Sequence, residues 1–561
     1  MIQRQTIDNN HILQYNAKIE SGDIIVGNKI YKVYKHLADK VLHENEYYYS
    51  PVRGEHVITF FERYLRHSKG KLGGKPVKLE LWEKAMLSAQ YGFINIEGIR
   101  EYTRCILIVG KKNGKSFVSS GEGLYLLCAD GEPGAEIYSV ATKKDQAKII
   151  WEEAKRMRNK SPALAKRVKS TINELRYDER DSVFKALASD ADTMDGLNVH
   201  GALFDEWHQW KNGRPLYNII ADGVSAREQP MLFMTSTAGT IREDIYDEIY
   251  DECELIINGY DEPDGYKDER TLPLIYELDN REEYKDESCW SKANPNLGVS
   301  KSYTYLREKV EKAIQNPVMR KNVLCKEFNI RETSSESWLS YEQLNNIETY
   351  DLKDLKPRYG IGGLDLSSTT DLTCATIIFK VTGNEKLYVK QMYWLPAELF
   401  EMRIKEDKIP YDKWLERGFL RLSDGNKIDY KDVTNWFVEV QNKSDIYIYK
   451  IGYDSWNSKY ITDELQQLFG KESTEPVIQG ARTMSSPMKT FAADLSAKQI
   501  VYDNNPILKW CLSNAAIQVD RNDNIALCKT SNARRRIDGV ASLLDAYICL
   551  ERNYENYMNL I

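Results

Sequence analysis

RCILIVGKKNGKS, residues 104–116, decides the fold of the first half of this 561-residue chain. Five apolar residues in a row, Cys105 to Val109, predict a buried strand. The glycine-containing loop GKKNG follows, and the apolar run from Phe117 to Leu127 predicts a helix. Strand, glycine loop, Lys-Ser and helix together are the parts of a phosphate-binding loop, since loop N–H groups and a helix N-terminus bind phosphate oxygens.

Within this loop, the sequence predicts which residues bind a nucleotide. Lysine supplies a point charge and the serine hydroxyl can hold Mg²⁺. The predicted nucleotide-binding residues are Lys112, Asn113, Gly114, Lys115 and Ser116. The pattern departs from G-x-x-x-x-G-K-[ST], because Val109 stands where the first glycine belongs and a loop counted from Gly110 is one residue short. A surface turn with a chance lysine is the alternative interpretation.

Two adjacent acids strengthen the prediction of a nucleotide site. Asp205 and Glu206 end the apolar run NVHGALFD, which predicts a buried strand over residues 198–205. One acid at such a strand end orders Mg²⁺, and the next activates the attacking water. We therefore predict that Asp205 binds Mg²⁺ and that Glu206 is catalytic; a solvated acidic turn is the alternative.

Further strands alternate with helices in this half of the chain. AEIYSVA, residues 135–141, and PMLFMTSTAGT, residues 230–240, predict strands, and the segment after residue 141 predicts a long helix. This alternation predicts an α/β fold, a parallel sheet with helices on both faces. Thr235, Ser236 and Thr237 fall where a γ-phosphate would lie, so their hydroxyls are candidates to sense it.

Composition is that of a globular protein, with 42% hydrophobic and 29% charged residues. The net charge of −7 argues against a protein that simply coats DNA, although a local basic patch on an enzyme stays compatible with it. No apolar run is long enough to span a bilayer, and the polar N-terminus shows no signal peptide. The nine cysteines contain no C-x-x-C pair, which indicates reduced core residues of a cytosolic protein.

Changes in composition divide the chain into five segments. Residues 1–75 predict a polar helical extension, 76–240 the nucleotide-binding core, 241–330 an acidic helical subdomain with one helix from Tyr303 to Phe328, 331–337 a linker and 338–561 a second domain. In LELWEKAMLSAQYGF, residues 79–93, Trp82 is a candidate to stack on a nucleotide base, with a core tryptophan as the alternative.

The second domain carries acids on separate elements. RYGIGGLDL, LTCATIIFK and KLYVKQMYW predict an antiparallel meander, and Asp365 ends its first strand. A later strand ends at Asp454, and the C-terminal helix begins at Asp538 and carries Asp545 two turns on. This order predicts a ribonuclease-H-like nuclease, in which three carboxylates hold two Mg²⁺ or Mn²⁺ ions about 4 Å apart. Asp365, Asp454 and Asp538 are the predicted catalytic metal ligands, and Asp371 and Asp545 are alternatives.

Arg534, Arg535 and Arg536 would suit a DNA backbone; a solvated basic cap is the other interpretation.

Together these motifs resemble the large terminase subunit of tailed double-stranded DNA bacteriophages. The resemblance rests on LWEKAML, GKKNGKS, ATKKDQA, DGLNVHGALFDEWH, MTSTAG, WSKANPNLG, GLDLSSTTDLT, IGYDSWNS and RRIDGVASLLDA, in this order along the chain. It implies a DNA-packaging motor, in which an ATPase drives DNA into a procapsid and a metal-dependent endonuclease cuts concatemeric DNA. By this resemblance Gly114 to Ser116 form the Walker A loop, Asp205 and Glu206 the Walker B acids, and Thr235 to Thr237 the coupling motif.

The resemblance also implies partners and location. The expected partners are double-stranded DNA, a portal protein, a small terminase subunit and four further copies in a five-membered ring, with no membrane. The expected location is the host cytoplasm, with transient docking on the procapsid portal and no place in the mature virion. ATP and Mg²⁺ are the expected cofactors, with Mn²⁺ as an alternative at the nuclease.

Two positions depart from the family pattern. Lys111 and Lys112 stand where the family often has arginine before Asn-Gly-Lys, and lysine cannot make the bidentate phosphate contact of arginine. Arg104 and Arg227 are candidates to supply that role. The adenine-side glutamine of the family is matched here by Glu83.

Two other classes of protein compete with this interpretation. A repair or replication helicase would also carry Asp-Glu after a strand, but it requires a second nucleotide-binding lobe, and none is visible after residue 240. A scaffolding component with degenerate sites would have lost some of these acids or the lysine, whereas all are present.

Overall fold

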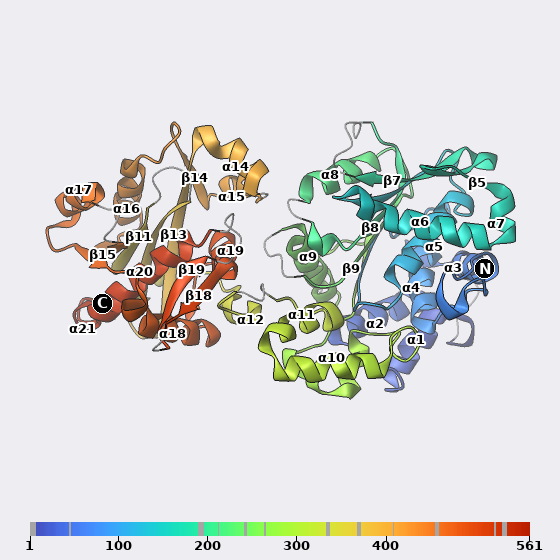
Figure 1. Ribbon diagram of the computed structural model, residues 1–561, viewed down its shortest axis with the longest axis horizontal. Helices are drawn as coiled ribbons and strands as arrows, with labels where there is room; N and C mark the ends of the chain where they lie inside the picture. The colour runs from blue at the N-terminus through green and yellow to red at the C-terminus, as the bar shows by residue number, and fades with distance from the viewer. Residues whose placement is uncertain are drawn as a thin grey trace. The chain divides into compact units, whose positions relative to one another are not determined.

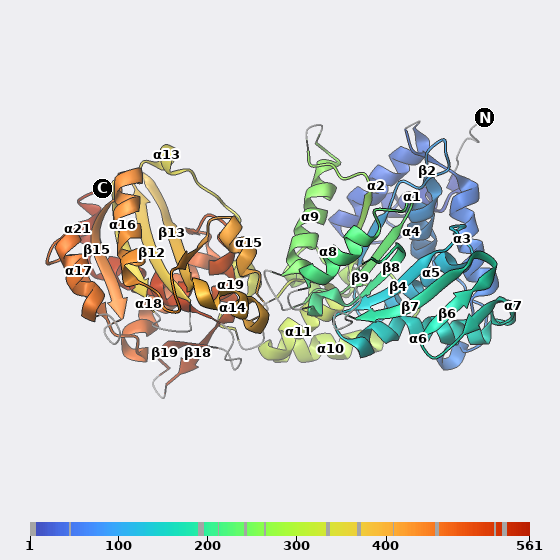
Figure 2. The same cartoon turned by 90° about the horizontal axis from the view of Figure 1, so that it is seen from above.

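The computed structural model describes residues 7–43, 46–188, 196–210, 213–239, 244–262, 265–332, 337–366, 372–407, 409–454, 459–520, 523–529 and 536–561. The chain forms two compact units, Met1–Arg331 and Glu332–Ile561 (Figure 1). Each unit contains a central β-sheet with helices packed against it (Figures 1 and 2). Among the described residues, no helix is both long enough and apolar enough to cross a membrane.

The sheet of the first unit has eight strands. Its strand order is β10 (Thr271–Ile275), β3 (Arg104–Ile108), β9 (Met231–Ser236), β8 (Val199–Asp205), β4 (Glu136–Ala141), β7 (Ser182–Ala188), β6 (Glu174–Tyr177) and β5 (Val168–Ser170). The strands from β10 to β7 run parallel, and β6 and β5 add an antiparallel edge. The four strands predicted from apolar runs are confirmed, and they occupy the buried centre of the sheet.

The helical subdomain predicted over residues 241–330 contains helices but also a strand that the prediction missed. Its short apolar run TLPLI forms β10, which pairs in parallel with β3 and extends the main sheet. Pro273 inside the run and the charged residues before it obscured the strand signal, because proline in a strand is confined mainly to edge strands such as this one. The single helix predicted from Tyr303 to Phe328 is also wrong, because the chain breaks at Asn316 and Pro317 into α10 (Tyr303–Gln315) and α11 (Pro317–Phe328).

Helices surround the sheet of the first unit. They are α1 (His11–Glu20), α2 (Asn28–Leu42), α3 (Pro51–Tyr64), α4 (Leu81–Gly92), α5 (Lys115–Cys128), α6 (Lys144–Lys160), α7 (Pro162–Arg167), α8 (Arg214–Gly223) and α9 (Ile245–Gly259). A two-stranded ribbon of β1 (Tyr48–Tyr49) and β2 (Phe93–Ile94) joins the N-terminal helices. Helix α5 packs on α6 and on the central strands, while residues 278–330 gather around a small hydrophobic cluster of their own.

The sheet of the second unit begins with the predicted meander. Its order is β14 (Leu420–Ser423), β13 (Asn384–Pro396), β12 (Thr373–Val381), β11 (Tyr359–Asp365), β15 (Tyr447–Asp454) and β16 (Thr474–Val477), with β17 (Ile500–Val501) beside β13. Strands β11, β12 and β13 are antiparallel neighbours, which confirms the meander, whereas β15 pairs with β11 in parallel. Strands β18 (Ala515–Val519) and β19 (Ile525–Lys529) form a separate hairpin.

The helices of this unit are α12 (Tyr341–Leu344), α13 (Leu352–Leu355), α14 (Phe400–Asp407), α15 (Tyr411–Glu416), α16 (Tyr430–Ser444), α17 (Lys459–Phe469), α18 (Ala481–Ser496), α19 (Pro506–Asn514), α20 (Asp538–Arg552) and α21 (Tyr554–Met558). Helix α20 is buried along nearly its whole length and lies directly on β11, β12 and β15. This buried C-terminal helix over a mixed sheet is the predicted ribonuclease-H-like arrangement.

Candidate functional site

The loop between β3 and α5 has the backbone of an anion-binding turn. Gly114 adopts a φ of 92°, directly before the first turn of α5, and Lys112 adopts a φ of 68°. Left-handed backbone is costly for a residue with a Cβ, so the conformation of Lys112 requires support from its surroundings. The N-terminus of α5, where Lys115 and Ser116 lie, carries the partial positive charge that attracts phosphate.

The two predicted acids come to this same edge of the sheet. Asp205 is the last residue of β8, and Glu206 follows it with a left-handed φ of 48°. Lys115 Nζ lies 3.2 Å from Glu206 Oε1, although the two residues are about ninety positions apart. Burial would raise the pKa of Glu206, but the charge of Lys115, followed by contact with His208, holds this pKa below its usual range. Burial and then the charge of Glu206 raise the pKa of Asp205 to about 6.

The hydroxyl-rich end of β9 faces these acids. Thr235 Oγ1 donates to Asp205 Oδ1 over 3.3 Å, and Thr237 Oγ1 donates to Glu206 Oε2 over 3.4 Å. His208 Nδ1 lies 2.9 Å from Ser236 Oγ and 3.1 Å from Glu206 Oε2. Sequence reasoning missed His208, whose only signal is its position two residues after the catalytic candidate.

A second group of residues missed from the sequence lies over the phosphate loop. They belong to WSKANPNLG, which the sequence analysis used only as one motif of the family resemblance and to which it gave no role. Asn113 Nδ2 donates to Asn294 Oδ1 over 2.9 Å, and the backbone N–H of Asn296 donates to Asn113 Oδ1 over 3.0 Å. No local pattern could identify these residues as loop contacts, because about 180 residues separate them from the loop.

Trp82 has the surroundings of a packed core residue. Its side chain is 3% exposed, its Nε1 donates to Asn296 Oδ1 over 2.8 Å, and the edge of one ring meets Tyr276 at 5.5 Å between centroids. Glu83 is also buried, and it accepts hydrogen bonds from the Glu80 N–H and from Asn296 Nδ2. This geometry favours the core interpretation of Trp82 over stacking on a base.

Arg104 and Arg227 lie at the wrong edge of the sheet to assist the phosphate loop. Arg104 is the first residue of β3, where its guanidinium pairs with Glu252 and Asp268. Arg227 donates to Asn198 and to Glu132, next to the beginnings of β8 and β4. In parallel strands these are the amino ends, whereas the phosphate loop follows the carboxyl end of β3. The expectation that either arginine serves this loop from within the chain is therefore wrong.

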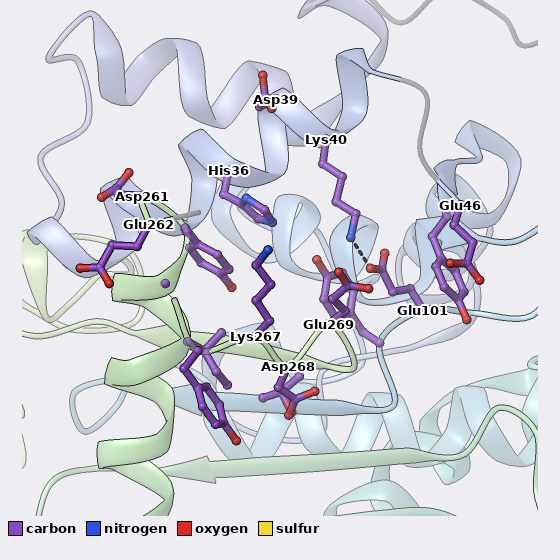
Figure 3. A pocket seen from close by; sticks show the side chains of 17 residues that line it. His36, Asp39, Lys40, Glu46, Glu101, Asp261, Glu262, Lys267, Asp268 and Glu269 are labelled. Carbon is purple, nitrogen blue, oxygen red and sulfur yellow. Dashed lines mark hydrogen bonds and ion pairs between the residues drawn. The ribbon is translucent and has the colours of Figure 1, made fainter. Parts of the chain in front are cut away.

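An acidic cavity of about 530 Å³ opens at that amino-terminal edge (Figure 3). Its acidic lining consists of Asp39, Glu46, Glu101, Asp261, Glu262, Asp268 and Glu269. Lys40 forms an ion pair with Glu101 across one side of it, and His36 stacks on Tyr260 at 4.1 Å. The cavity is distinct from the nucleotide site, because the phosphate loop follows the carboxyl end of β3 at the opposite edge of the sheet.

In the second unit, two predicted metal ligands share one strand edge. Leu364 of β11 pairs in register with Tyr453 of β15, so Asp365 and Asp454 end neighbouring parallel strands side by side. Two residues before each acid is a glycine, Gly363 and Gly452, which also pair with each other. Side chains alternate along a strand, so each acid points to the same face as the missing Cβ of its glycine.

Helix α20 lies on that face. A Cβ at Gly363 would stand 2.7 Å from Ala546 N, and a Cβ at Gly452 would stand 2.9 Å from Asp545 C. Asp545 is therefore held beside both strand-end acids. Burial, followed by the charge of Asp365, raises the pKa of Asp545 well above its usual range, and Asp454 acts in the same direction. Gln479 Nε2 donates to Asp545 Oδ2 over 3.2 Å.

Asp538 lies further along the sheet, over β13. The neighbouring Gly539 accepts a 2.8 Å hydrogen bond from Gln391 Nε2 through its carbonyl oxygen, and the charge of Asp538 acts on the pKa values of Cys511 and Tyr393. In the part of the chain that the structure describes, no three Asp, Glu, His or Cys side chains lie close enough to hold one metal ion. Asp365, Asp454 and Asp538 are thus on one face but are not gathered into a ready-made cage.

Four candidate residues of the second unit remain: Asp371, Arg534, Arg535 and Arg536. Asp371, Arg534 and Arg535 lie outside the described residues. Arg536 is buried, with its Nη2 3.4 Å from Asp407 Oδ2, so it is no solvated basic cap.

Comparison with known families assigns a domain to each half of the chain. Residues 81–254 match the ATPase domain of the terminase large subunit, and residues 267–552, more than half of the chain, match its endonuclease domain. The chain belongs to the terminase large subunits. Its ATPase match contains Lys115, Asp205 and Glu206, and its endonuclease match contains all the acids of the second unit discussed above.

Known large terminases resemble this one over most of their length. The large terminase of Enterobacteria phage HK97 is 27% identical over 495 residues, covering 88% of this chain and 94% of the relative. The large terminase of Lactococcus phage p2 is 22% identical over 537 residues, covering 93% and 95%. The crystal structure of the HK97 large terminase aligns at 25% identity with a TM-score of 0.47, covering 89% of this chain and 99% of that one.

This large terminase is therefore an ATPase and endonuclease of the phage DNA-packaging motor. The helicase interpretation receives no support. The endonuclease match begins at residue 267, inside the first structural unit. Strand β10 and the segment over the phosphate loop therefore lie within the sequence matched to the endonuclease domain, although they fold as part of the first unit.

Proposed function

We propose that the edge formed by the β3–α5 loop, the end of β8 and the end of β9 hydrolyses ATP. The observation that carries this proposal is the contact between Lys115 and Glu206, because it brings the phosphate-binding lysine and the catalytic acid together from distant parts of the chain. Gly114, Lys115 and Ser116 bind the phosphates, with Lys112 and Asn113 shaping the loop. Asp205 and Ser116 are the oxygen donors that suit Mg²⁺, which neutralises phosphate charge when it is bound.

In this site Glu206 holds and activates the attacking water. With its pKa held low by Lys115 and His208, its carboxylate is charged and able to accept a proton or a hydrogen bond from that water. Thr237 contacts Glu206, so a movement of Thr237 when the γ-phosphate leaves would also move the Glu206 side chain. Trp82, the predicted adenine-side residue, acts in this proposal as a buried packing residue that donates a hydrogen bond to Asn296.

We propose that Asp365, Asp454 and Asp538 form the nuclease centre and that Asp545 belongs to it. Asp545 Oδ1 is buried and has no hydrogen-bond partner among the described residues, which fits a position opposite a cation. A set of carboxylates is the donor chemistry of Mg²⁺ and Mn²⁺. When bound, such ions activate water and stabilise the leaving oxygen of a phosphodiester. The chain itself positions these acids through the contact of α20 with Gly363 and Gly452.

The partners follow from family membership. We propose double-stranded DNA as the substrate, a portal protein and a small terminase subunit as partners, and a ring of five copies during packaging in the host cytoplasm. We also propose the division into a helical extension (1–75), ATPase core (76–240), linker-side subdomain (241–330), linker (331–337) and nuclease (338–561).

Three substitutions test the assignment of sites. We expect Lys115→Ala to abolish ATP hydrolysis and to leave Mn²⁺-dependent nicking of plasmid DNA intact, and Asp365→Ala to do the reverse. Asp545→Asn is the third variant, and we expect it to lose nicking like Asp365→Ala. If Asp365→Ala still cuts DNA at the wild-type rate, the nuclease assignment is wrong.

A further inference from the structure

The phosphate loop of this terminase is fastened from outside by one segment, residues 290–301, and by the end of α11. Gly110 N donates to Ala293 O over 3.0 Å, and Lys111 N donates to Lys326 O over 2.8 Å. Lys112 O accepts a hydrogen bond from Ser300 Oγ over 2.8 Å. Together with the contacts of Asn113, four successive loop residues bond to a part of the chain that is remote in sequence.

Asn294 is the centre of this fastening. Its side chain is fully buried, and its Oδ1 accepts from Asn113 Nδ2 over 2.9 Å and from Lys301 Nζ over 2.6 Å. Its Nδ2 donates to Trp290 O over 3.0 Å and to Glu327 O over 2.9 Å. All of the usual hydrogen-bonding capacity of this amide is thus used, which fixes its orientation.

The contact with Asn294 leaves no room for a side chain at Gly110, the first residue of the loop. A Cβ on Gly110 would collide with Asn294 Oδ1 and would stand 2.7 Å from Glu327 O and 2.9 Å from Ala293 O. Behind Asn294, Lys301 and Glu327 form a buried ion pair at 2.6 Å. Removing one partner of such a pair is costly, so the pair holds α11 and the 290–301 segment in one arrangement.

We propose that Asn294 is a positioning residue for ATP hydrolysis, which holds the phosphate loop through Asn113 in the shape that aligns Lys115 with Glu206. Asn113 Nδ2 also donates to Gly110 O over 2.8 Å, so the hydrogen bond between Asn294 and Asn113 restrains both ends of the loop. Lys115 lies two residues beyond Asn113. The inference rests on the proposed role of this loop in ATP hydrolysis and adds the residue that sets its geometry.

The expected kinetic effect distinguishes positioning from binding. Alignment of Lys115 and Glu206 with the reacting phosphate matters most in the transition state, whereas attraction of the triphosphate to the loop operates in the bound substrate as well. Loss of the Asn294 amide should therefore lower kcat by about 10- to 100-fold and change KM by less than about threefold. The loss should also be shared with Asn113, because both act through one contact.

The experiment measures steady-state ATP hydrolysis by the full chain for Asn294→Ala, Asn113→Ala and the double variant. We expect the double variant to lose no more than about threefold beyond the worse single variant, the sign of a shared contact. Gly110→Ala is a second, independent way of displacing Asn294 and should also lower kcat. The matched control is Asn10→Ala, a buried asparagine of the same unit that caps α1 and does not contact the loop; it should keep wild-type kcat at a similar cost in stability.

Each outcome separates this inference from the proposed function. If Lys115→Ala abolishes hydrolysis while Asn294→Ala and Gly110→Ala both keep kcat within about threefold of wild type, the positioning role is wrong and the ATPase site stands. If Lys115→Ala still hydrolyses ATP, the site assignment fails first. If the losses of Asn294→Ala and Asn113→Ala multiply in the double variant, the two residues act separately and the proposed contact is refuted.

Discussion

Replacing Gly363 with alanine should separate the two activities of this terminase. Gly363 lies under α20, where a Cβ would be 2.7 Å from Ala546 N, 2.8 Å from Ala546 Cβ and closer still to the carbonyl oxygen of Ser542. These atoms are helix backbone or directly attached to it, so they cannot move aside by changing a rotamer. The whole helix must shift away from β11, by about 1 Å, to restore ordinary contact.

The shift acts directly on the nuclease acids. Asp545 lies between the two residues that collide, and Asp365 is two residues past the substitution on the same face. Misplacing a catalytic group by about 1 Å costs on the order of 10²-fold in rate, and overpacking costs about 1–3 kcal/mol of stability. We therefore expect Gly363→Ala to lose about 100-fold in DNA nicking with a modest fall in the Tm of the second unit.

The assay is Mn²⁺-dependent nicking of supercoiled plasmid, with ATP hydrolysis measured in the same preparation. Gly362→Ala is the matched control, because Gly362 is adjacent on β11 but faces α16, where a Cβ would stand 3.0 Å from Phe437 Cε1. The same Cβ would stand 2.8 Å from Ile451 Cγ1 of the paired strand β15. We expect this control to share the stability cost and keep nicking within about threefold of wild type. Should Gly363→Ala nick DNA as fast as Gly362→Ala, the contact of α20 with β11 does not position the acids and the reasoning fails.

Three further predictions concern the acids of the chain. Glu206→Gln should lower ATP hydrolysis by about 10³-fold and leave nicking unchanged, measured as phosphate release; activity within tenfold of wild type would remove Glu206 from the chemistry. Chelation with EDTA should stop nicking by the Lys115→Ala variant, and added Mn²⁺ should restore it; nicking that survives EDTA would exclude a metal-dependent nuclease. Burial raises the pKa of Glu122 to about 8 against hydrogen bonds from Gln90 and Tyr91. The folded state therefore keeps a proton that the unfolded state releases above its ordinary value of 4.5, so stability should fall as pH rises from 4.5 to about 8. Glu122→Gln should flatten this fall, whose size is about 3–5 kcal/mol, in urea unfolding at pH 5 and pH 8; an equally steep fall in the variant would show that another group titrates.

Local patterns in the sequence predicted much of both sites. Apolar runs bounded by glycine or acids identified β3, β8, β9 and the meander, because burying such a run is favourable wherever it lies in the fold. The acids that end β8, β11 and β15 were predicted for the same local reason. By contrast, the edge strand β10 contains Pro273 and lies among acidic residues, which obscured its strand signal. Arg104 was a candidate for the loop although it begins β3, the strand whose other end carries the loop, so the length of the strand keeps the two apart.

What the sequence determined by itself is therefore the set of local parts: a phosphate loop, strand-end acids and a C-terminal helix bearing two carboxylates. Only the tertiary structure decided that Asn294 contacts the loop, that Trp82 is buried and hydrogen-bonded to Asn296, and that Asp545 lies beside Asp365 and Asp454. The physical reason is the sequence separation between the residues that make each contact. Strand and turn signals arise from neighbouring residues, whereas these contacts join segments about 90 to 200 residues apart, and their loop-closure entropy is recovered only when the whole sheet has formed.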